Sequence, residues 1–502
     1  MKLFTCNQIA EIDQLTMILE PISSIDLMDR ASMAVADWII NNLGNKHPFW
    51  FFAGPGNNGG DALAVARMLA FAHFNCTLFI ADFGKELKGD PAINLERLKD
   101  QNLVLIKRID LETAIPEIPS TVIIIDGLFG SGLTRPLDEL AAEIVKKINQ
   151  SHAQVISIDI PSGLMGEENS QPVLSAIVRA SHTLTFQFPK ISFLFPENYI
   201  YTRNVKVLPI GLSTEAMHQI KSNYTYLTKE FISAKIIKRD KFSHKGTFGH
   251  ALLIAGSYGK MGAAVLASKA CLRSGVGLLT SHIPRLGYEI LQNSVPEAMA
   301  SIDPSDSVFT GFPTISLFSA VGIGPGLDQK TVSLNALQEL LYARPAKMVI
   351  DADALNMLAA NQELYRLLPP NTILTPHPRE LERLVGASAN SFKQLQVQLQ
   401  FSARYKIIVV CKGAHTCITF PNGEVYFNST GNAGMATGGS GDVLTGIILG
   451  LLAQSYSAED ATLIGVYLHG VAGDLAAAKF GQPAMIAGDI IEQLGAAFQQ
   501  LE

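Results

Sequence analysis

A glycine-rich segment near the C-terminal end, residues 431–454 (GNAGMATGGSGDVLTGIILGLLAQ), places one carboxylate where a helix is expected to begin. Gly438, Gly439 and Gly441 let the backbone approach an anion closely, and the free N–H groups at a helix start attract negative charge. Asp442 would repel an anion held there, but it is well placed as a base that takes a proton from a hydroxyl attacking a phosphate. The structural alternative is a turn in which Asp442 caps the helix. The motif alone leaves both interpretations open.

Four other segments of the second half follow expected strands: GPG at 324–326, DADAL at 351–355, TPHPRE at 375–380 and KGAHT at 412–416. His377 stands between two prolines, which hold it in an extended loop and make it a ligand candidate. Lys412 and the backbone N–H groups after it can hold a nucleotide phosphate. Alternatively, Lys412 is a solvated surface lysine. Its place at the end of an apolar strand argues mildly against this alternative.

Three polar loops of the first half also follow expected strands: AGPGNNGGDALAVAR at 53–67, DGLFGSGLTRP at 126–136 and SIDIPSGL at 157–164. In the first of them, Asn57 and Asn58 add amide donors and acceptors, and Asp61 can cap the following helix. Each loop alone is compatible with a simple connector. Together at one sheet edge they indicate a site for a phosphate-bearing ligand and a hard, weakly held cation. No His/Cys cluster suits zinc or another transition metal.

The elements that position these loops form two α/β halves. In the first half, the apolar runs PFWFFA, CTLFIA, TVIIID and AQVISID alternate with helical patterns. The second half begins again near Gly249 and has further strands ending near residues 322, 351, 377 and 413. Such alternation predicts mostly parallel sheets with helices on both faces and a ligand crevice at the carboxyl ends of the strands. We expect domains at 1–213 and 224–502, joined by a linker at 214–223.

Bulk properties exclude several classes of protein. The chain has 502 residues, 48% of them hydrophobic and 17% charged, with a net charge of −6, which describes a well-cored globular protein without a nucleic-acid-binding patch. Five scattered cysteines fit reduced thiols, and Glu11 and Asp13 precede any long apolar run. No run of apolar residues is long enough for a bilayer. We therefore expect a cytoplasmic protein that binds neither nucleic acid nor membrane.

The motifs, in their order and spacing, resemble the bifunctional NAD(P)H-hydrate repair enzymes. The resemblance covers nearly the whole chain and is carried by PGNNGGD, DGLFGSGLTRP, DIPSGL, VLPIGL, GSYGKMGAAVLASKACLRSGVGLLT, GIGPGL, DADALNML, TPHPRE, KGAHT and the 431–454 segment. It implies an N-terminal Rossmann-like three-layer domain with NAD(P)HX epimerase activity. It also implies a C-terminal ribokinase-like three-layer α/β domain that is an ADP-dependent NAD(P)HX dehydratase.

The resemblance also implies roles for individual residues. In the epimerase half, the implied NAD(P)HX-binding residues are Asn57, Asn58, Gly59, Gly60, Asp61, Gly130, Ser131, Gly132, Leu133, Thr134, Arg135, Pro136 and Asp159. Asp159 resembles the active-site acid, and Asn58, Asp126 and Ser162 resemble potassium ligands. In the dehydratase half, the hydrate-site positions are Ala264, Gly326, His377 and Asp442. The ADP-site positions are Lys412, Gly413, Ala414, His415, Thr416 and Gly441.

The implied activity converts the R and S forms of NADHX and NADPHX into each other and dehydrates the S form with ADP, yielding AMP and phosphate. K+ is the expected ion of the first domain and Mg2+ that of the second. We also expect a homo-oligomer, for which the apolar helices of residues 22–43 offer a surface. Two alternatives are a ribokinase-like vitamin-precursor kinase with an accessory ligand-binding domain, and a nucleotide-binding scaffold without activity. The PGNNGGD half argues against the kinase.

Overall fold

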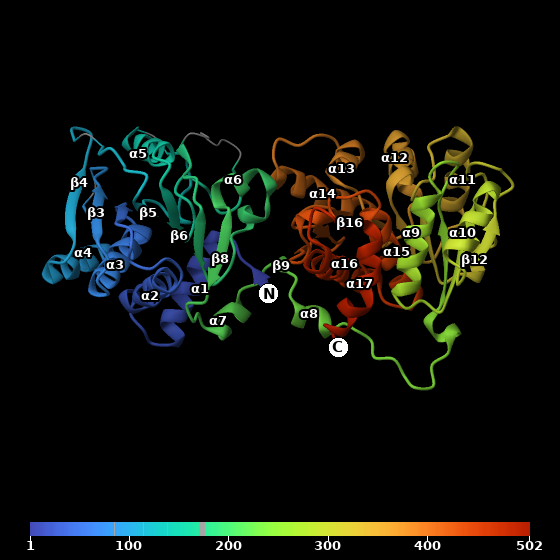
Figure 1. Ribbon diagram of the computed structural model, residues 1–502, viewed down its shortest axis with the longest axis horizontal. Coiled ribbons are helices and arrows are strands. Elements are labelled where there is room, and N and C mark those ends of the chain that lie inside the picture. The colour runs from blue at the N-terminus through green and yellow to red at the C-terminus, as the bar shows by residue number, and fades with distance from the viewer. Residues whose placement is uncertain (85, 114, 138, 170–175) are drawn as a thin grey trace. The chain divides into compact units, whose positions relative to one another are not determined.

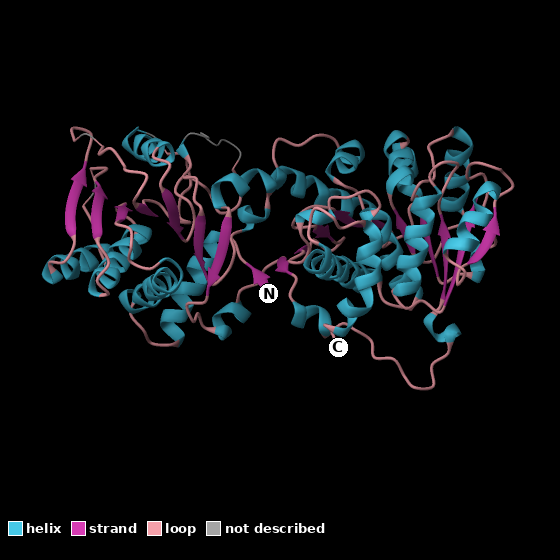
Figure 2. Ribbon diagram, in the orientation of Figure 1, coloured by secondary structure: helices cyan, strands magenta, loops and turns pink. Residues whose placement is uncertain are grey.

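The computed structural model describes residues 1–502 except 85, 114, 138 and 170–175. Two compact units are present (Figure 1). The N-terminal unit comprises Leu3–Ser222 and Ala389–Phe392, and the C-terminal unit comprises Met1–Lys2, Asn223–Ser388 and Lys393–Glu502. Helices cover the strands in both units (Figure 2). The two-halves organisation expected from the strand–helix alternation is therefore present.

The N-terminal unit contains a seven-stranded sheet in the order β4-β3-β2-β5-β6-β7-β8, with parallel pairing between all neighbours. Its strands are β2 (Phe49–Ala53), β3 (Cys76–Ala81), β4 (Leu105–Ile109), β5 (Ile123–Gly127), β6 (Gln154–Ile158), β7 (His182–Phe186) and β8 (Asn204–Leu208). Its helices are α1 (Cys6–Leu19), α2 (Ser24–Leu43), α3 (Asn57–Phe71), α4 (Asp90–Gln101), α5 (Glu139–Gln150), α6 (Tyr199–Thr202) and α7 (Thr214–Gln219).

Alternation along the strands divides the apolar side chains between the two faces of this sheet. Phe51 and Ile125 pack with α2, α3 and α4, whereas Phe52 and Ile124 pack with α5 on the other face. The four strands expected from apolar runs are β2, β3, β5 and β6. Strands β4, β7 and β8 were not expected, because β4 and β8 are largely exposed edge strands and β7 (HTLTF) alternates polar and apolar residues, so none has a continuous apolar run.

Two local expectations for this unit differ from the structure. Helix α3 begins at Asn57, so the residues expected to form a loop belong to its first turns. Gly56 is the N-cap, and Asp61 is buried inside the helix and does not cap it. The segment 214–223, expected as a linker, contains helix α7, capped by the Ser213 hydroxyl and anchored by the fully buried Ala216.

The C-terminal unit is built on a larger sheet, in the order β1-β9-β18-β17-β16-β15-β14-β13-β10-β11-β12. The pairs from β12 to β16 are parallel, and β17 pairs antiparallel with β16 and β18. Its strands are β1 (Lys2–Leu3), β9 (Tyr224–Tyr226), β10 (His250–Ile254), β11 (Leu278–Ile283), β12 (Met299–Ile302), β13 (Ala320–Ile323), β14 (Met348–Ile350), β15 (Ile373–Leu374), β16 (Ile408–Cys411), β17 (Cys417–Thr419) and β18 (Val425–Phe427). Its helices are α8 (Lys229–Ser233), α9 (Met261–Arg273), α10 (Tyr288–Ser294), α11 (Thr331–Tyr342), α12 (Ala352–Ala360), α13 (Pro378–Val385), α14 (Ser391–Tyr405), α15 (Ser440–Ala453), α16 (Ala458–Phe480) and α17 (Ala487–Gln499).

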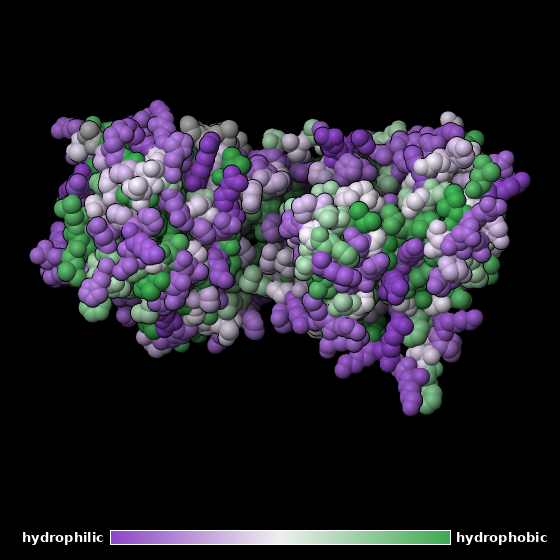
Figure 3. Space-filling view, in the orientation of Figure 1, coloured by the Kyte–Doolittle hydropathy of each residue, from purple (hydrophilic) through white to green (hydrophobic). Residues whose placement is uncertain are grey.

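Both faces of the parallel strands are covered, as all-parallel sheets require. On β10, Leu253 packs with α9, α15, α16 and α17, and Leu252 packs with α11 to α14 on the opposite face. Within the described part of the chain, only α16 is long and apolar enough to cross a membrane, and most of that stretch is buried inside the unit. The visible face of each unit is mainly polar, with smaller apolar patches between polar side chains (Figure 3).

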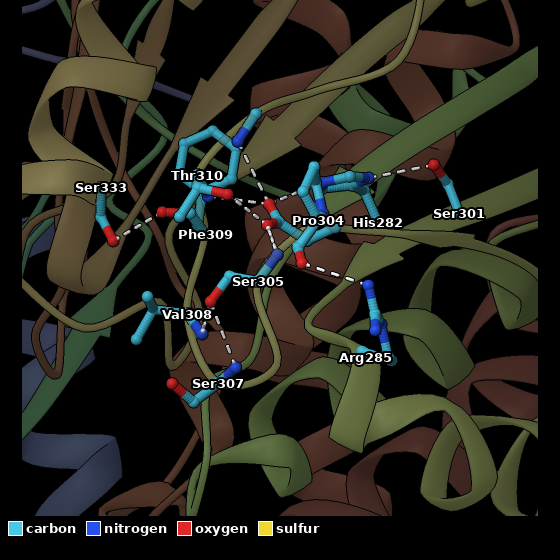
Figure 4. Close-up of polar contacts among 12 residues, drawn as sticks. His282, Arg285, Ser301, Pro304, Ser305, Ser307, Val308, Phe309, Thr310 and Ser333 are labelled. Carbon is cyan, nitrogen blue, oxygen red and sulfur yellow. Dashed lines mark hydrogen bonds and ion pairs between the residues drawn. The ribbon is translucent and has the colours of Figure 1, made fainter.

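A buried carboxylate organises the loop after β12. Asp303 accepts hydrogen bonds from the backbone N–H groups of Ser305, Thr310 and Gly311, and its Oδ2 lies 3.1 Å from His282 Nε2. Figure 4 shows the polar contacts around this loop, including the contact between His282 and Ser301. The same loop accepts a hydrogen bond from the N–H of Tyr258, through the carbonyl of Ser307. Asp303 thereby supports the β10–α9 loop, which follows the carboxyl end of a central strand.

We expect Asp303→Asn to destabilise the C-terminal unit. Hydrogen bonds from His282 and Thr310 outweigh burial and hold the pKa of Asp303 down at about 2. Because this folded-state pKa lies below the unfolded value, the stabilisation is complete above about pH 4 and disappears as pH falls through about 2. It amounts to about 2 kcal/mol at neutral pH.

Calorimetric unfolding at pH 7 and pH 3 measures this effect, with the exposed Asp306→Asn as matched control. The difference in free energy of unfolding between the wild type and Asp303→Asn should be smaller at pH 3 than at pH 7. An equal difference at both pH values would contradict the assignment.

Candidate active sites of the two units

The N-terminal unit has a cavity of about 1000 Å3 beyond the carboxyl ends of its strands. The predicted residues that line it are Asn57, Asn58, Asp61, Gly130, Ser131, Gly132, Leu133, Thr134, Arg135 and Asp159. Gly59, Gly60 and Pro136 lie outside this lining. A Cβ atom at Gly59 would lie 1.9 Å from the carbonyl oxygen of Gly54, so glycine is required there for the close approach of helix and loop.

Asp159 is the most constrained carboxylate of this cavity. It follows β6 with a φ of 62°, a left-handed conformation that is uncommon outside glycine. Its Oδ1 accepts a 2.7 Å hydrogen bond from Lys190 Nζ, whose side chain is 1% exposed. The hydroxyl of Thr185 and the N–H of Phe186 also donate to Asp159. A strained backbone and a buried counter-charge around one acid favour a functional role for Asp159.

The structure brings Asn58, Asp126 and Ser162 together around the carbonyl of Phe129. Asn58 Nδ2 lies 3.0 Å and Ser162 Oγ 3.2 Å from that oxygen, and Ser162 Oγ lies 2.6 Å from Asp126 Oδ1. Asp126 is fully buried, and burial raises its pKa. No lysine, arginine or histidine pairs with Asp126 among the residues that the structure describes. Hydroxyl and backbone donors already bind Asp126, and this buried carboxyl without a protein cation, next to hard oxygen atoms, fits a monovalent cation.

Sequence reasoning missed two charged residues, Asp13 in the lining of this cavity and Lys190 buried behind Asp159. Lys190 has no motif that distinguishes it from a surface lysine, and only its burial against Asp159 reveals it. Asp13, used in sequence only to exclude a signal peptide, lies on α1 and lines the cavity. Burial, with a contribution from Asp159 and against the effect of Lys190, raises the pKa of Asp13 to about 7.

In the C-terminal unit, Asp351 follows β14 and forms hydrogen bonds with residues of two segments that are distant in sequence, the end of β16 and helix α15. Its Oδ1 accepts a 2.9 Å hydrogen bond from Lys412 Nζ, at the end of β16, and its Oδ2 accepts a 2.7 Å bond from Thr445, on α15. Gly441 lets this cluster lie against the start of α15, because its Cβ would stand 3.2 Å from Lys412 Nζ. Lys412 is 22% exposed and paired, so the interpretation as a solvated surface lysine does not hold. Burial lowers the pKa of Lys412, but Asp351 and Glu380 raise it further, and the ammonium stays charged.

Asp442 lies in the first turn of α15, which has Gly439 as its N-cap. The alternative interpretation, in which Asp442 caps the helix, is therefore wrong. Burial and the neighbouring Asp351 raise the pKa of Asp442 to about 6, opposed by Lys412. Within the described ranges, no donor forms a hydrogen bond with this carboxylate. Asp442 is thus an ionised acceptor at neutral pH with lone pairs available for a ligand.

The other predicted hydrate-site positions lie on three further segments, the start of α13, the loop after β13 and helix α9. His377 is extended and is the N-cap of α13, where its Nδ1 accepts from the N–H groups of Arg379 and Glu380. Because Nδ1 is an acceptor, Nε2 carries the proton, and the ring is 45% exposed. Gly326 lies in the loop after β13, where its carbonyl accepts from Ser257 Oγ. Ala264 is fully buried in α9.

The predicted ADP-site residues after Lys412 form a tight exposed loop. Thr416 Oγ1 bonds both the N–H and the carbonyl of Gly413, and Ala414 is exposed between them. The Nδ1 of His415 lies 3.2 Å from the carbonyl of Asn428, and burial lowers the pKa of His415. The neutral ring and exposed backbone suit a nucleotide next to Lys412.

We expect Lys190→Met to destabilise the N-terminal unit by about 3 kcal/mol, because it leaves the carboxylate of Asp159 buried without its cation. Chemical denaturation followed by tryptophan fluorescence measures this directly, since both tryptophans, Trp38 and Trp50, lie in this unit. The matched control is Lys206→Met, at an exposed position of β8. Equal free energies of unfolding for the two variants would contradict a structural role for the ion pair.

Comparisons with known proteins agree with the division of the chain into two units. Residues 251–495 match the family model described as NAD(P)H-hydrate dehydratase, and residues 24–192 match the model described as YjeF-related protein N-terminus. The chain is 33% identical to a bifunctional NAD(P)H-hydrate repair enzyme of Moorella thermoacetica, over 100% of this chain and 97% of the relative. It is 32% identical to a bifunctional NAD(P)H-hydrate repair enzyme of Thermofilum pendens, over 95% of this chain and 92% of the relative.

A solved structure resembles the C-terminal part of the chain. The ADP/ATP-dependent NAD(P)H-hydrate dehydratase of Bacillus subtilis, co-crystallised with ATP and Mg2+, has a TM-score of 0.50 and 33% identity, covering 55% of this chain and 99% of that one. Both the sequence motifs and the full-length relatives therefore point to the same two-part enzyme. The chain belongs to the family of bifunctional NAD(P)H-hydrate repair enzymes.

Proposed function

We propose that the C-terminal unit dehydrates S-NAD(P)HX to NAD(P)H with ADP as phosphate donor, and that Asp442 is the base. The nicotinamide ring of the substrate has added water at C6, and hydroxide is a poor leaving group. Transfer of the β-phosphate of ADP to that hydroxyl, with loss of its proton to Asp442, turns it into phosphate. Phosphate then leaves as the ring nitrogen lone pair forms an iminium bond, loss of a proton from C5 to solvent gives NAD(P)H, and AMP remains.

The observation that carries this assignment is the free carboxylate of Asp442, with its pKa raised to about 6, at the start of α15. Backbone N–H groups of Gly439 and Gly441 stabilise the phosphoryl oxygens, and Lys412 and the loop to Thr416 hold the nucleotide. His377 and Gly326 belong to the walls of the hydrate site in this proposal, whereas the fully buried Ala264 contributes through the packing of α9. A vitamin-precursor kinase would also use a base here, but the N-terminal half of the chain has no place in that alternative.

Mg2+ accompanies the diphosphate in this proposal. Asp351 and Asp353 are the carboxylates that act on Asp442, and both already accept hydrogen bonds from protein donors. They are therefore poor candidates for direct Mg2+ ligands. Mg2+ would neutralise phosphate charge on the bound diphosphate, while Lys412 and the loop to Thr416 orient the nucleotide.

We further propose that the N-terminal unit interconverts the R and S epimers, so that both reach the dehydratase. Asp159 exchanges protons during the reversible change at C6, and the residues of the α3 start and of the 130–136 loop bind the nucleotide. Asn58, Asp126 and Ser162 would hold K+ next to the carbonyl of Phe129, where the ion would supply positive charge beside the buried carboxyl of Asp126. The chain acts on both NADHX and NADPHX and is cytoplasmic in this proposal.

A homo-oligomer is also part of the proposal, although α2 offers less surface than its composition indicates. Most of its large apolar side chains pack inside the unit, and Met33 and Ile40 are the exposed ones. These two residues mark the part of α2 that remains for a contact between copies.

We expect Asp442→Asn to lower the rate of ADP-dependent dehydration of S-NADHX by about 10² to 10⁴, because the asparagine amide accepts no proton. Return of reduced-nicotinamide absorbance measures the rate. In the wild type the rate should fall as pH drops below about 6, where Asp442 becomes protonated. Asp306→Asn, at an exposed position, is the matched control. Wild-type dehydration by Asp442→Asn would refute the assignment.

The two reactions should separate in single variants of the full chain. Asp159→Asn should abolish interconversion of the epimers, followed by NMR without ADP, and leave dehydration of pure S-NADHX unchanged. Asp442→Asn should slow dehydration and leave interconversion of the epimers unchanged. Replacing K+ by tetramethylammonium at constant ionic strength should slow epimerisation, and the effect should disappear in Asp126→Asn. Dehydration that depends on Asp159 would contradict the division of labour.

A further inference from the structure

Among the described acids that line the N-terminal cavity, Asp13 is the one whose carboxyl has no partner in the protein. Its side chain lies on α1 and lines the cavity together with Asp159. No hydrogen bond or ion pair holds its carboxyl among the residues that the structure describes. Asp159, by contrast, is held by Lys190, Thr185 and Phe186. Asp13 and Asp159 therefore differ: the carboxyl of Asp159 is held in place by protein donors, whereas that of Asp13 is not.

The charged surroundings of Asp13 come from several elements. Asp61 on α3, Asp159 after β6 and Glu167 in the following loop supply negative charge, and Lys190 is the nearby cation. Cys6 on α1 itself is kept as a neutral thiol because burial raises its pKa to about 12. In this setting burial and Asp159 raise the pKa of Asp13 to about 7, so the group can both give and take a proton at neutral pH.

Inversion at C6 places two opposite demands on the site. The hydroxyl that leaves from one face of the ring needs a proton, and the water that arrives on the other face must lose one. Asp159 has its carboxylate fixed by Lys190 and by backbone and side-chain donors, and a fixed group serves one face. A second acid/base group in the same cavity is then required.

We propose that Asp13 is this second acid/base group, acting on the face of the ring opposite to Asp159. This rests on the proposed epimerase function. Protonated Asp13 gives its proton to the C6 hydroxyl, the C6–O bond breaks, and water leaves as the ring nitrogen lone pair forms an iminium bond. A water on the other face then bonds to C6 and gives a proton to Asp159. The reverse reaction uses the same two groups in exchanged protonation states, so atoms and charge balance.

Asp61 is the alternative for this role, since it also lines the cavity. Its Oδ1, however, lies 3.1 Å from the hydroxyl of Ser32, which holds it in place. Burial raises the pKa of Asp61 well above its ordinary range, although the Ser32 hydroxyl lowers it, so this carboxyl is both buried and bound to a protein partner. Among the cavity acids that the structure describes, Asp13 combines freedom from hydrogen-bond partners with a pKa of about 7.

Oxygen exchange tests the proposal in the full-length enzyme, with R- or S-NADHX in H2(18)O and without ADP. In the wild type, each inversion should incorporate one solvent oxygen at C6. Asp13→Asn should invert at least about 10²-fold more slowly, while the epimer whose hydroxyl faces Asp159 still exchanges oxygen with retention of configuration. Asp13→Glu should recover part of the inversion rate. Glu11→Gln, exposed on the same helix, is the matched control.

Three results would overturn the proposal: wild-type inversion by Asp13→Asn, inversion without oxygen incorporation in the wild type, or loss of oxygen exchange from both epimers in Asp13→Asn. Dehydration of S-NADHX by each variant, and its tryptophan-monitored unfolding, show that the protein is folded. Failure of the wild type to interconvert the epimers would instead refute the epimerase function itself, so the two failures are distinguishable.

Discussion

The buried carboxylate of Asp351 is the interaction on which the C-terminal site depends. A charge removed from water must be compensated by hydrogen bonds and an opposite charge, and Lys412 and Thr445 supply both. These partners come from the end of β16 and from α15, so the pairing ties two distant segments to the end of β14. It also directs the cation of Lys412 to the place where α15 begins, which is where a phosphate is attracted by the helix start.

The same constraint leaves Asp442 as the reactive group. Lys412 is already satisfied by Asp351, so it lowers the pKa of Asp442 without forming an ion pair with it. Burial and the negative charge of Asp351 act in the other direction. A carboxylate with a pKa of about 6 and open lone pairs is ionised at neutral pH, yet is basic enough to accept a proton.

In the N-terminal unit, the buried acids are stabilised by different kinds of partner. Asp159 is compensated by a buried lysine and Asp126 by hydroxyl and backbone donors, with a cation as the proposed remaining partner. Burial raises the pKa of Asp61, and burial together with Asp159 raises the pKa of Asp13 to about 7. The acids of this unit thus have different partners and surroundings, and such differences separate acid from base roles.

The sequence by itself determined the two α/β halves, the central strands and the strand-end loops, because apolar runs and glycine-rich turns are local signals. It also singled out Asp159, Lys412 and Asp442, through motifs whose order is specific to one family. Only the tertiary structure showed that α3 starts at Asn57, that residues 214–219 form a helix, and that Asp442 is no cap. Only the structure, too, revealed Lys190 and Asp13, since a lysine's burial and a carboxyl's lack of partners are set by residues distant in the chain. Local patterns encode the elements, whereas protonation states arise where those elements meet.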